Sequence, residues 1–177
     1  MNHSSSTTSH AASDGQGSTR SPIELSITSQ VDARWHGVLE RMLFFNDQQD
    51  AVRARVAAAI DRYGAMQIES HGGWLRLRLE RLADTQALFG VLGDGRPVGC
   101  VVFSRDAADR FLVLHVAVEP AFTARGGLAD SDVLLKLIGA VRASARLTRG
   151  VQRVDLLYAA GRMRSLRVRS SAAAEPG

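Results

Sequence analysis

The segment from Arg110 to Tyr158 constrains the fold of this chain more than any other part of the sequence. It begins with residues 110–118, in which every side chain after Arg110 is apolar except that of His115. A strand with apolar side chains on both faces is typical of the interior of a sheet that is covered on both sides. Glu119-Pro120 then predicts the end of this strand, because proline cannot donate a hydrogen bond to a neighbouring strand.

A glycine-bearing loop, an amphipathic helix and a second apolar strand are predicted next. The loop 121–130 contains Arg125-Gly126-Gly127, and paired glycines allow the backbone to turn tightly and to approach a ligand closely. From Ser131 onward, apolar residues recur at helical spacing: Leu134, Leu137, Ile138, Val141 and Ala145. Residues 151–158 alternate as a strand does. The order predicts two parallel strands joined by a helix, whose first turn is a place where such units bind anions.

The preceding residues predict further strands and two helices. Short strands are expected at 23–27, 74–80, 86–92 and 97–104, and Gly93-Asp94-Gly95 is a hairpin signal between the last two. Two helices are expected from the spacing of the apolar residues Trp35, Val38, Leu39, Met42, Val52, Val56, Ile60 and Tyr63. Together these elements predict a mixed α/β (α+β) fold with a largely antiparallel sheet, flanking helices and one parallel strand pair.

Composition divides the 177 residues into three parts. Residues 1–21 are rich in Ser, Thr, His and Gly and are expected to be a disordered leader, without the apolar stretch that export requires. Residues 22–159 are expected to form one domain, and 160–177 a basic, flexible tail, with a last strand through Leu166 and Val168 as the alternative. The chain has no apolar run of the roughly 20 residues that span a bilayer, so a cytoplasmic protein without membrane contact is expected.

Charge and metal-binding residue types exclude some functions. The net charge is +4, and the tail holds four arginines and one glutamate, so the rest of the chain is nearly neutral, which disfavours a nucleic-acid-binding domain. The histidines show no metal-ligand spacing, and no metal site is predicted. The single cysteine, Cys100, lies in an apolar run and is expected to be a buried thiol.

The sequence Leu114-His115-Val116-Ala117-Val118-Glu119-Pro120, followed by a glycine loop, a helix and a strand, resembles the GCN5-related N-acetyltransferase family. The resemblance implies a mixed sheet in which acetyl-CoA, or another acyl-CoA, lies along the backbone of Val116, Ala117 and Val118. It also implies that the loop residues Arg125, Gly126, Gly127 and Ala129 bind the diphosphate. The family's loop has Arg or Gln three residues before its first glycine; here that position holds Ala124 before Gly127, or Thr123 before Gly126.

The function implied is acyl transfer to an amine that attacks the thioester directly. His115 is the candidate general base, although a histidine in the core is the alternative, and Tyr158 is the candidate residue of the cleft between the parallel strands. The acceptor stays open between a small amine, an antibiotic, a polyamine and a protein terminus. Two other functions remain: an inactive binding or interaction module of the same shape, and a nucleic-acid-associated protein using the arginine-rich tail. The short segment after Tyr158 leaves two alternatives: an open acceptor side, or a homodimer in which a second chain completes the sheet.

Overall fold

The computed structural model describes residues 23–45, 53–157 and 164–168. The helices, including short 3-10 turns marked η, are η1 (Ala33–Trp35), α1 (His36–Phe44), α2 (Arg53–Tyr63), η3 (Pro120–Phe122), η4 (Ala129–Ser131) and α3 (Val133–Leu147). The strands are β1 (Leu25–Thr28), β2 (Met66–His71), β3 (Trp74–Leu79), β4 (Thr85–Leu92), β5 (Pro97–Ala107), β6 (Arg110–Val118), β7 (Arg153–Leu156) and β8 (Arg164–Arg167).

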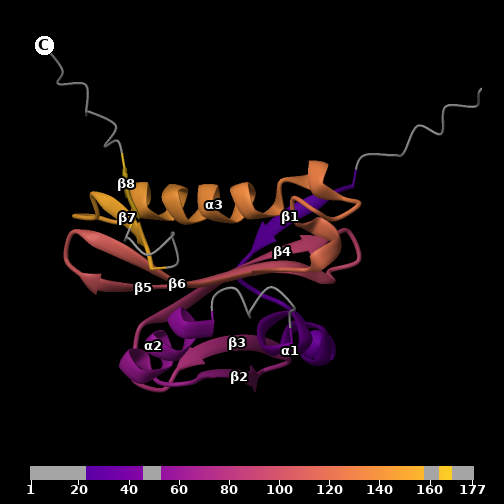
Figure 1. The fold of residues 1–177 in the computed structure, drawn as a ribbon, viewed down its shortest axis with the longest axis horizontal. Helices are drawn as coiled ribbons and strands as arrows, with labels where there is room; N and C mark the ends of the chain where they lie inside the picture. The colour runs from indigo at the N-terminus through magenta and orange to yellow at the C-terminus, as the bar shows by residue number, and fades with distance from the viewer. Residues whose placement is uncertain (1–22, 46–52, 158–163, 169–177) are drawn as a thin grey trace, which may run out of the picture.

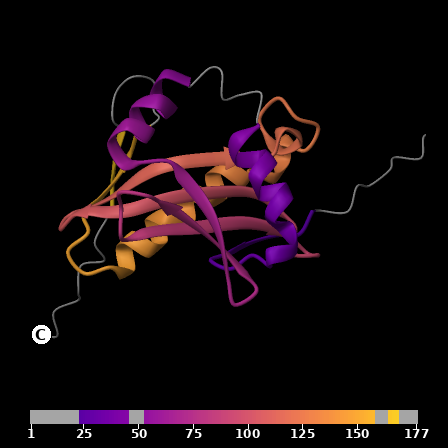
Figure 2. The same ribbon diagram turned by 90° about the horizontal axis from the view of Figure 1, so that it is seen from below.

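A six-stranded sheet in the order β1-β4-β5-β6-β7-β8 forms the centre of the molecule. Its neighbouring strands are antiparallel except for β6 and β7, which are parallel. Helix α3 covers one face of this sheet, and α1, α2 and the β2–β3 hairpin lie on the other (Figures 1 and 2). The predicted mixed, largely antiparallel sheet with one parallel pair is confirmed.

The two faces of the central strands contribute to two separate hydrophobic clusters. Leu112, Leu114 and Ala117 pack on the side of α1 and the hairpin, and Phe111 and Val113 pack on the side of α3. Strand β5 is buried from Pro97 through Ser104, as the two-sided apolar pattern predicts. Cys100 lies within this strand and is fully buried, and burial raises the pKa of its thiol to about 12.

A β-bulge in β6 changes which side chains face which cluster. Val102 of β5 is opposite His115, but the next residue, Phe103, is opposite Val113, so β6 has one extra residue, Leu114. Leu114 and His115 therefore face the same side, and both line one pocket. Strict alternation along the strand would have placed His115 with Val113 on the α3 face. The bulge moves it to the side of α1 and α2.

Two elements differ from the sequence-based expectations. Strand β2 was not predicted; it pairs with β3, and the resulting two-stranded sheet stands apart from the central one. The turn between them uses Gly72 and Gly73, both with positive φ, which side chains with a Cβ rarely adopt. Strand β8 pairs antiparallel with β7, so residues 164–167 adopt the last strand that was the alternative to a flexible tail. The expected leader, 1–21, lies outside the described residues.

Candidate functional site

The parallel strands β6 and β7 stay paired over only part of their length. Their register runs from Arg110 opposite Arg153 to Val113 opposite Leu156, and the N–H of Leu157 donates to the carbonyl oxygen of Val113 (3.1 Å). Strand β6 then continues to Val118, whereas β7 ends at Leu156. Among the described residues, β6 is thus paired on one side only beyond Val113.

The hydrogen bonds to β5 fix the direction of the backbone groups of β6 after Val113. Glu119 donates its N–H to the carbonyl oxygen of Val98 on β5 (2.9 Å). Because the backbone groups of successive strand residues point to opposite sides, those of Val116 and Val118 point away from β5. This is the side from which β7 has separated, so Val116 presents its peptide groups along an edge of the divergence.

A pocket of about 220 Å3 opens on the α1 and α2 side of the same part of β6. Its walls come from five elements: Leu43, Phe44, Ala59, Ile60, Tyr63, Met66, Leu79, Leu114 and His115, with Gly64 beside them. Phe44 and Ile60 are 40% and 45% exposed, which gives the pocket an apolar rim. None of the described residues that line it carries a carboxylate.

Two groups with polar atoms belong to this otherwise apolar lining. Burial lowers the pKa of His115 to about 4, so its imidazole is neutral at physiological pH. Tyr63 is only 7% exposed, and its hydroxyl oxygen is buried without a hydrogen-bond partner among the described residues. Leaving such a hydroxyl unsatisfied costs about 1–3 kcal/mol, which a hydrogen-bonding group at that position would recover.

The loop after β6 uses several of its own amides internally. Gly126 donates to the carbonyl oxygen of Thr123 (2.8 Å), and Ala129 to that of Gly126 (3.3 Å). A Cβ at Gly126 would overlap the carbonyl oxygens of Pro120 and Ala121, so this glycine is needed for the loop to pack on itself. Of the four loop residues expected to contact a diphosphate, Arg125 and Gly127 are those whose amides have no acceptor among the described residues.

The start of α3 lies directly after this loop. Asp132 precedes the helix in a left-handed conformation (φ 51°), and its side chain does not cap the helix. Val133 is packed close to β5: a Cβ at Gly99 would lie 2.6 Å from the Cγ1 atom of Val133. Gly99, opposite Val118 in the sheet, therefore allows the first turn of α3 to lie close against β5.

The site residues expected from the sequence are only partly brought together. His115 and Val116 are adjacent at the bulge, with His115 in the pocket and the peptide groups of Val116 at the strand edge. Tyr158 lies outside the described residues, and its role stays a prediction. Sequence reasoning treated Tyr63 only as a helix position. The available signal was a phenol among apolar residues on one helix face.

The part of the chain that the structure describes shows no group of His, Cys, Asp and Glu side chains that could hold a metal ion. In the same residues, no helix has the length and apolar character needed to cross a bilayer.

Comparison with known proteins finds similarity among solved structures. No protein-family model matches the chain, and no curated protein does. The structure of nourseothricin acetyltransferase is similar over 51% of this chain and 56% of that one, with 21% identity and a TM-score of 0.32. The GNAT family N-acetyltransferase YhbS from Escherichia coli, in complex with CoA, is similar over 78% of this chain and 64% of that one, with 17% identity and a TM-score of 0.42. The chain thus spans less than two thirds of either protein. Both are acetyltransferases by name, and the second is named in the family that this sequence resembles.

Proposed function

We propose that this protein is an acyl-CoA-dependent N-acyltransferase that transfers an acetyl group to an apolar amine. One observation carries the proposal: the divergence of β6 from β7 and the apolar pocket meet at consecutive residues, His115 and Val116. A strand edge suits an extended chain with amide groups, and the pocket beside it suits the group that reacts with that chain. The mixed sheet with its parallel pair supports the same function.

The residues present fit acyl-CoA in two places. The peptide groups of Val116 can pair with an extended, amide-bearing arm in the manner of a neighbouring strand. The amides of Arg125 and Gly127, the Arg125 guanidinium and the first turn of α3 can receive a diphosphate. Gly127 has open space around it, so a ligand can approach its backbone closely. The exposed carboxylate of Asp132 at the start of α3 weakens this attraction.

Acyl-CoA, when bound, supplies a thioester carbonyl that an amine can attack. The pocket then selects the amine: without a carboxylate in the described lining, it does not stabilise an ammonium ion, so the amine enters as the neutral base. The N–C bond forms as the C–S bond breaks. We assign to His115 the relay of the proton from the amine nitrogen to the leaving thiolate, because its neutral imidazole lines the pocket next to Val116. Its low pKa makes it a weak acceptor that passes the proton on readily. Held in this geometry, the two reactants gain roughly 7–11 kcal/mol from positioning.

Thermal unfolding with and without excess acetyl-CoA tests the cofactor half of the proposal. At a hundred times the dissociation constant, acetyl-CoA should stabilise the protein by roughly 2.7 kcal/mol, which is about 5–10 °C for a domain of this size. AMP, the control, should give no shift. The Gly127→Glu variant should lose the acetyl-CoA shift, because its carboxylate repels the diphosphate. Gly139→Glu is a matched control, because Gly139 also has open space around it but lies on α3 away from the loop.

The acceptor half is tested by the release of free CoA thiol with two amines of opposite character. We expect turnover with 2-phenylethylamine and none with spermidine, which remains polycationic. A preference for spermidine would contradict the assignment of the pocket.

The inactive module remains the second candidate, and the internal hydrogen bonds of Gly126 and Ala129 favour it. An absent shift with acetyl-CoA in the unmodified protein would make that candidate the better one.

A further inference from the structure

A large polar groove lies at the end of the sheet where β6 and β7 begin. Its volume is about 960 Å3, and its lining residues come from the C-terminal end of α3, the turn after it, β7 and β8. Figure 1 shows where these elements lie. Asp109, just before β6, belongs to its wall. His115 is six residues further along the chain, so the groove and the pocket are separated by roughly 20 Å along the strand.

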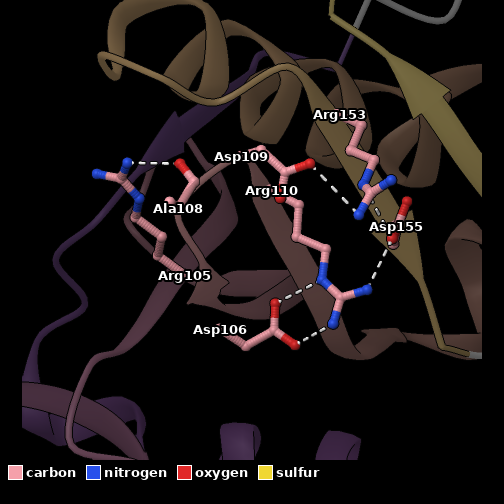
Figure 3. A network of polar contacts seen from close by, with 7 residues as sticks. All are labelled: Arg105, Asp106, Ala108, Asp109, Arg110, Arg153 and Asp155. Atoms are coloured by element: carbon pink, nitrogen blue, oxygen red, sulfur yellow. Dashed lines mark hydrogen bonds and ion pairs between the residues drawn. The ribbon is translucent and has the colours of Figure 1, made fainter.

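Arginine is the prevailing charged residue of this groove. Arg146, Arg149, Arg153 and Arg167 line it, whereas Asp109 is the one acid among the described lining residues. The aspartates near the groove form ion pairs with two arginines (Figure 3). Arg110 contacts Asp106 (2.6 Å) and Asp155 (3.3 Å). Arg153 contacts Asp109 (3.4 Å) and Asp155 (3.7 Å).

Arg146, Arg149 and Arg167 consequently have no carboxylate partner among the described residues. A guanidinium at the last turn of a helix is a common arrangement, because it interacts favourably with the helix dipole. That explanation covers Arg146 at the end of α3, but not Arg167, which belongs to β8. Two elements distant in sequence thus bring unneutralised charges to one cavity.

The segments that carry these arginines are held in place by specific contacts. The Nη2 atom of Arg105 donates to the carbonyl oxygens of Ala108 (2.6 Å) and Arg149 (3.0 Å), which ties the turn after α3 to the turn before β6 (Figure 3 shows the first bond). The pairing of β8 with β7 fixes the backbone position of Arg167. The next residue, Val168, donates its N–H to the carbonyl oxygen of Gln152 (2.8 Å). These contacts fix the backbone positions from which the exposed side chains of Arg149 and Arg167 extend.

The lining also indicates which anion the groove would take. Its neutral polar side chains are Thr148, Gln152 and Ser165, and none of the described lining residues is aromatic. Guanidinium groups match phosphate oxygens with paired hydrogen bonds, whereas nucleobases are bound mainly by stacking on aromatic rings. The volume greatly exceeds that of a single phosphate.

We propose that this groove binds an extended chain of phosphate groups, such as the backbone of a single-stranded nucleic acid, without reading its bases. The near-neutral charge of the chain before its tail does not oppose this, because the positive charge is gathered at one end of the sheet. Inorganic polyphosphate has the same chemistry and is the other source of such a ligand.

The test is binding of a fluorescent dT12 oligonucleotide and of inorganic polyphosphate of similar length, measured by fluorescence anisotropy, direct or by competition, over a range of salt concentrations. Three arginine–phosphate contacts on a single strand predict that log K falls with log [salt] with a slope of about −2. In the Arg146→Gln/Arg167→Gln variant the slope should shrink to about −0.7, because each contact contributes roughly −0.7. The control, Arg41→Gln/Arg76→Gln, removes the same charge at exposed positions outside the groove and should bind as the unmodified protein does.

Each outcome decides between sources or rejects the site. Binding of both ligands supports recognition of phosphate alone, and binding of only one identifies its source. Absence of binding to either ligand overturns the proposal. Equal weakening in both double variants would show that general charge, and not the groove, carries the affinity.

Discussion

At His115, the local sequence pattern and the tertiary structure assign the side chain to different faces of the sheet. On the sequence alone it is the single polar side chain of an apolar strand. The bulge opposite Val102 and Phe103 places its side chain in the pocket beside Tyr63, where burial lowers the pKa of the imidazole to about 4. Its position in the pocket therefore depends on one extra residue in β6.

A pH-dependent loss of stability is expected from the low pKa of His115. The unfolded chain binds this proton near pH 6.5 and the native protein only near pH 4, so the unfolded state holds more protons in between. The free energy of unfolding therefore falls as the pH is lowered through that window. Between pH 7 and pH 5, the unmodified protein should lose about 2 kcal/mol more than the His115→Gln variant. Urea unfolding at the two pH values measures this, and equal losses would contradict the burial of a neutral imidazole.

Among the elements, the β6–β7 pair is the one whose partial pairing creates the candidate site. Its register includes Leu112 opposite Asp155, a carboxylate that is only 3% exposed. Asp155 lies within ion-pair distance of Arg110 and Arg153, while its other oxygen, Oδ1, has no partner among the described residues. Hydrogen bonding to Asp106, together with the nearby Asp155, raises the pKa of the Arg110 guanidinium, which stays charged.

The buried carboxylate is expected to stabilise this strand pair more than an exposed one nearby. Asp155→Asn leaves Arg110 and Arg153 without their shared buried partner, and should lower the free energy of unfolding by about 1–3 kcal/mol. Asp109→Asn removes a pair that is 45% and 43% exposed, and should cost less than about 1 kcal/mol. Urea denaturation of both variants gives the comparison. A larger effect at Asp109 would show that the buried pair does not stabilise the parallel strands.

In the whole molecule, the pocket and the groove lie at different places along one sheet. The pocket is lined by α1 and α2, whereas the groove lies at the C-terminal end of α3, beside β7 and β8. Figures 1 and 2 show that α1 and α2 lie on the face of the sheet opposite α3. This arrangement would let one protein hold a polyanion at one end while an amine and a thioester meet at the bulge. The two activities would then be independent of each other.

Independence of the two sites gives a prediction at this scale. The Arg146→Gln/Arg167→Gln variant should keep the full thermal shift with acetyl-CoA, because neither arginine lies at the loop or the bulge. Gly127→Glu should keep the affinity for dT12, because Gly127 lies at the opposite end of α3 from the groove. Loss of both activities in either variant would mean that the sites are coupled or that the variant is misfolded. Circular dichroism spectra of both proteins separate those two explanations.

Local pattern was sufficient for much of the fold. The apolar run of β6, the helical spacing of α3 and the hairpin at Gly93-Asp94-Gly95 each depend on residues close in sequence, and each element formed where it was expected. Strand β2 was missed because it carries only two apolar residues, Met66 and Ile68, although Gly72-Gly73 signalled a turn. Its pairing with β3 outside the central sheet had no local signal.

The sequence by itself determined the strand–loop–helix–strand unit and the burial of Cys100. Only the tertiary structure decided which face His115 occupies, because the bulge is a mismatch in register between β5 and β6. It also decided that arginines from α3 and β8 share one groove, since residues distant in sequence meet only when the sheet assembles. The spacing of apolar residues in the sequence indicates which side chains are buried. Which residues these side chains contact depends on how whole helices and strands pack.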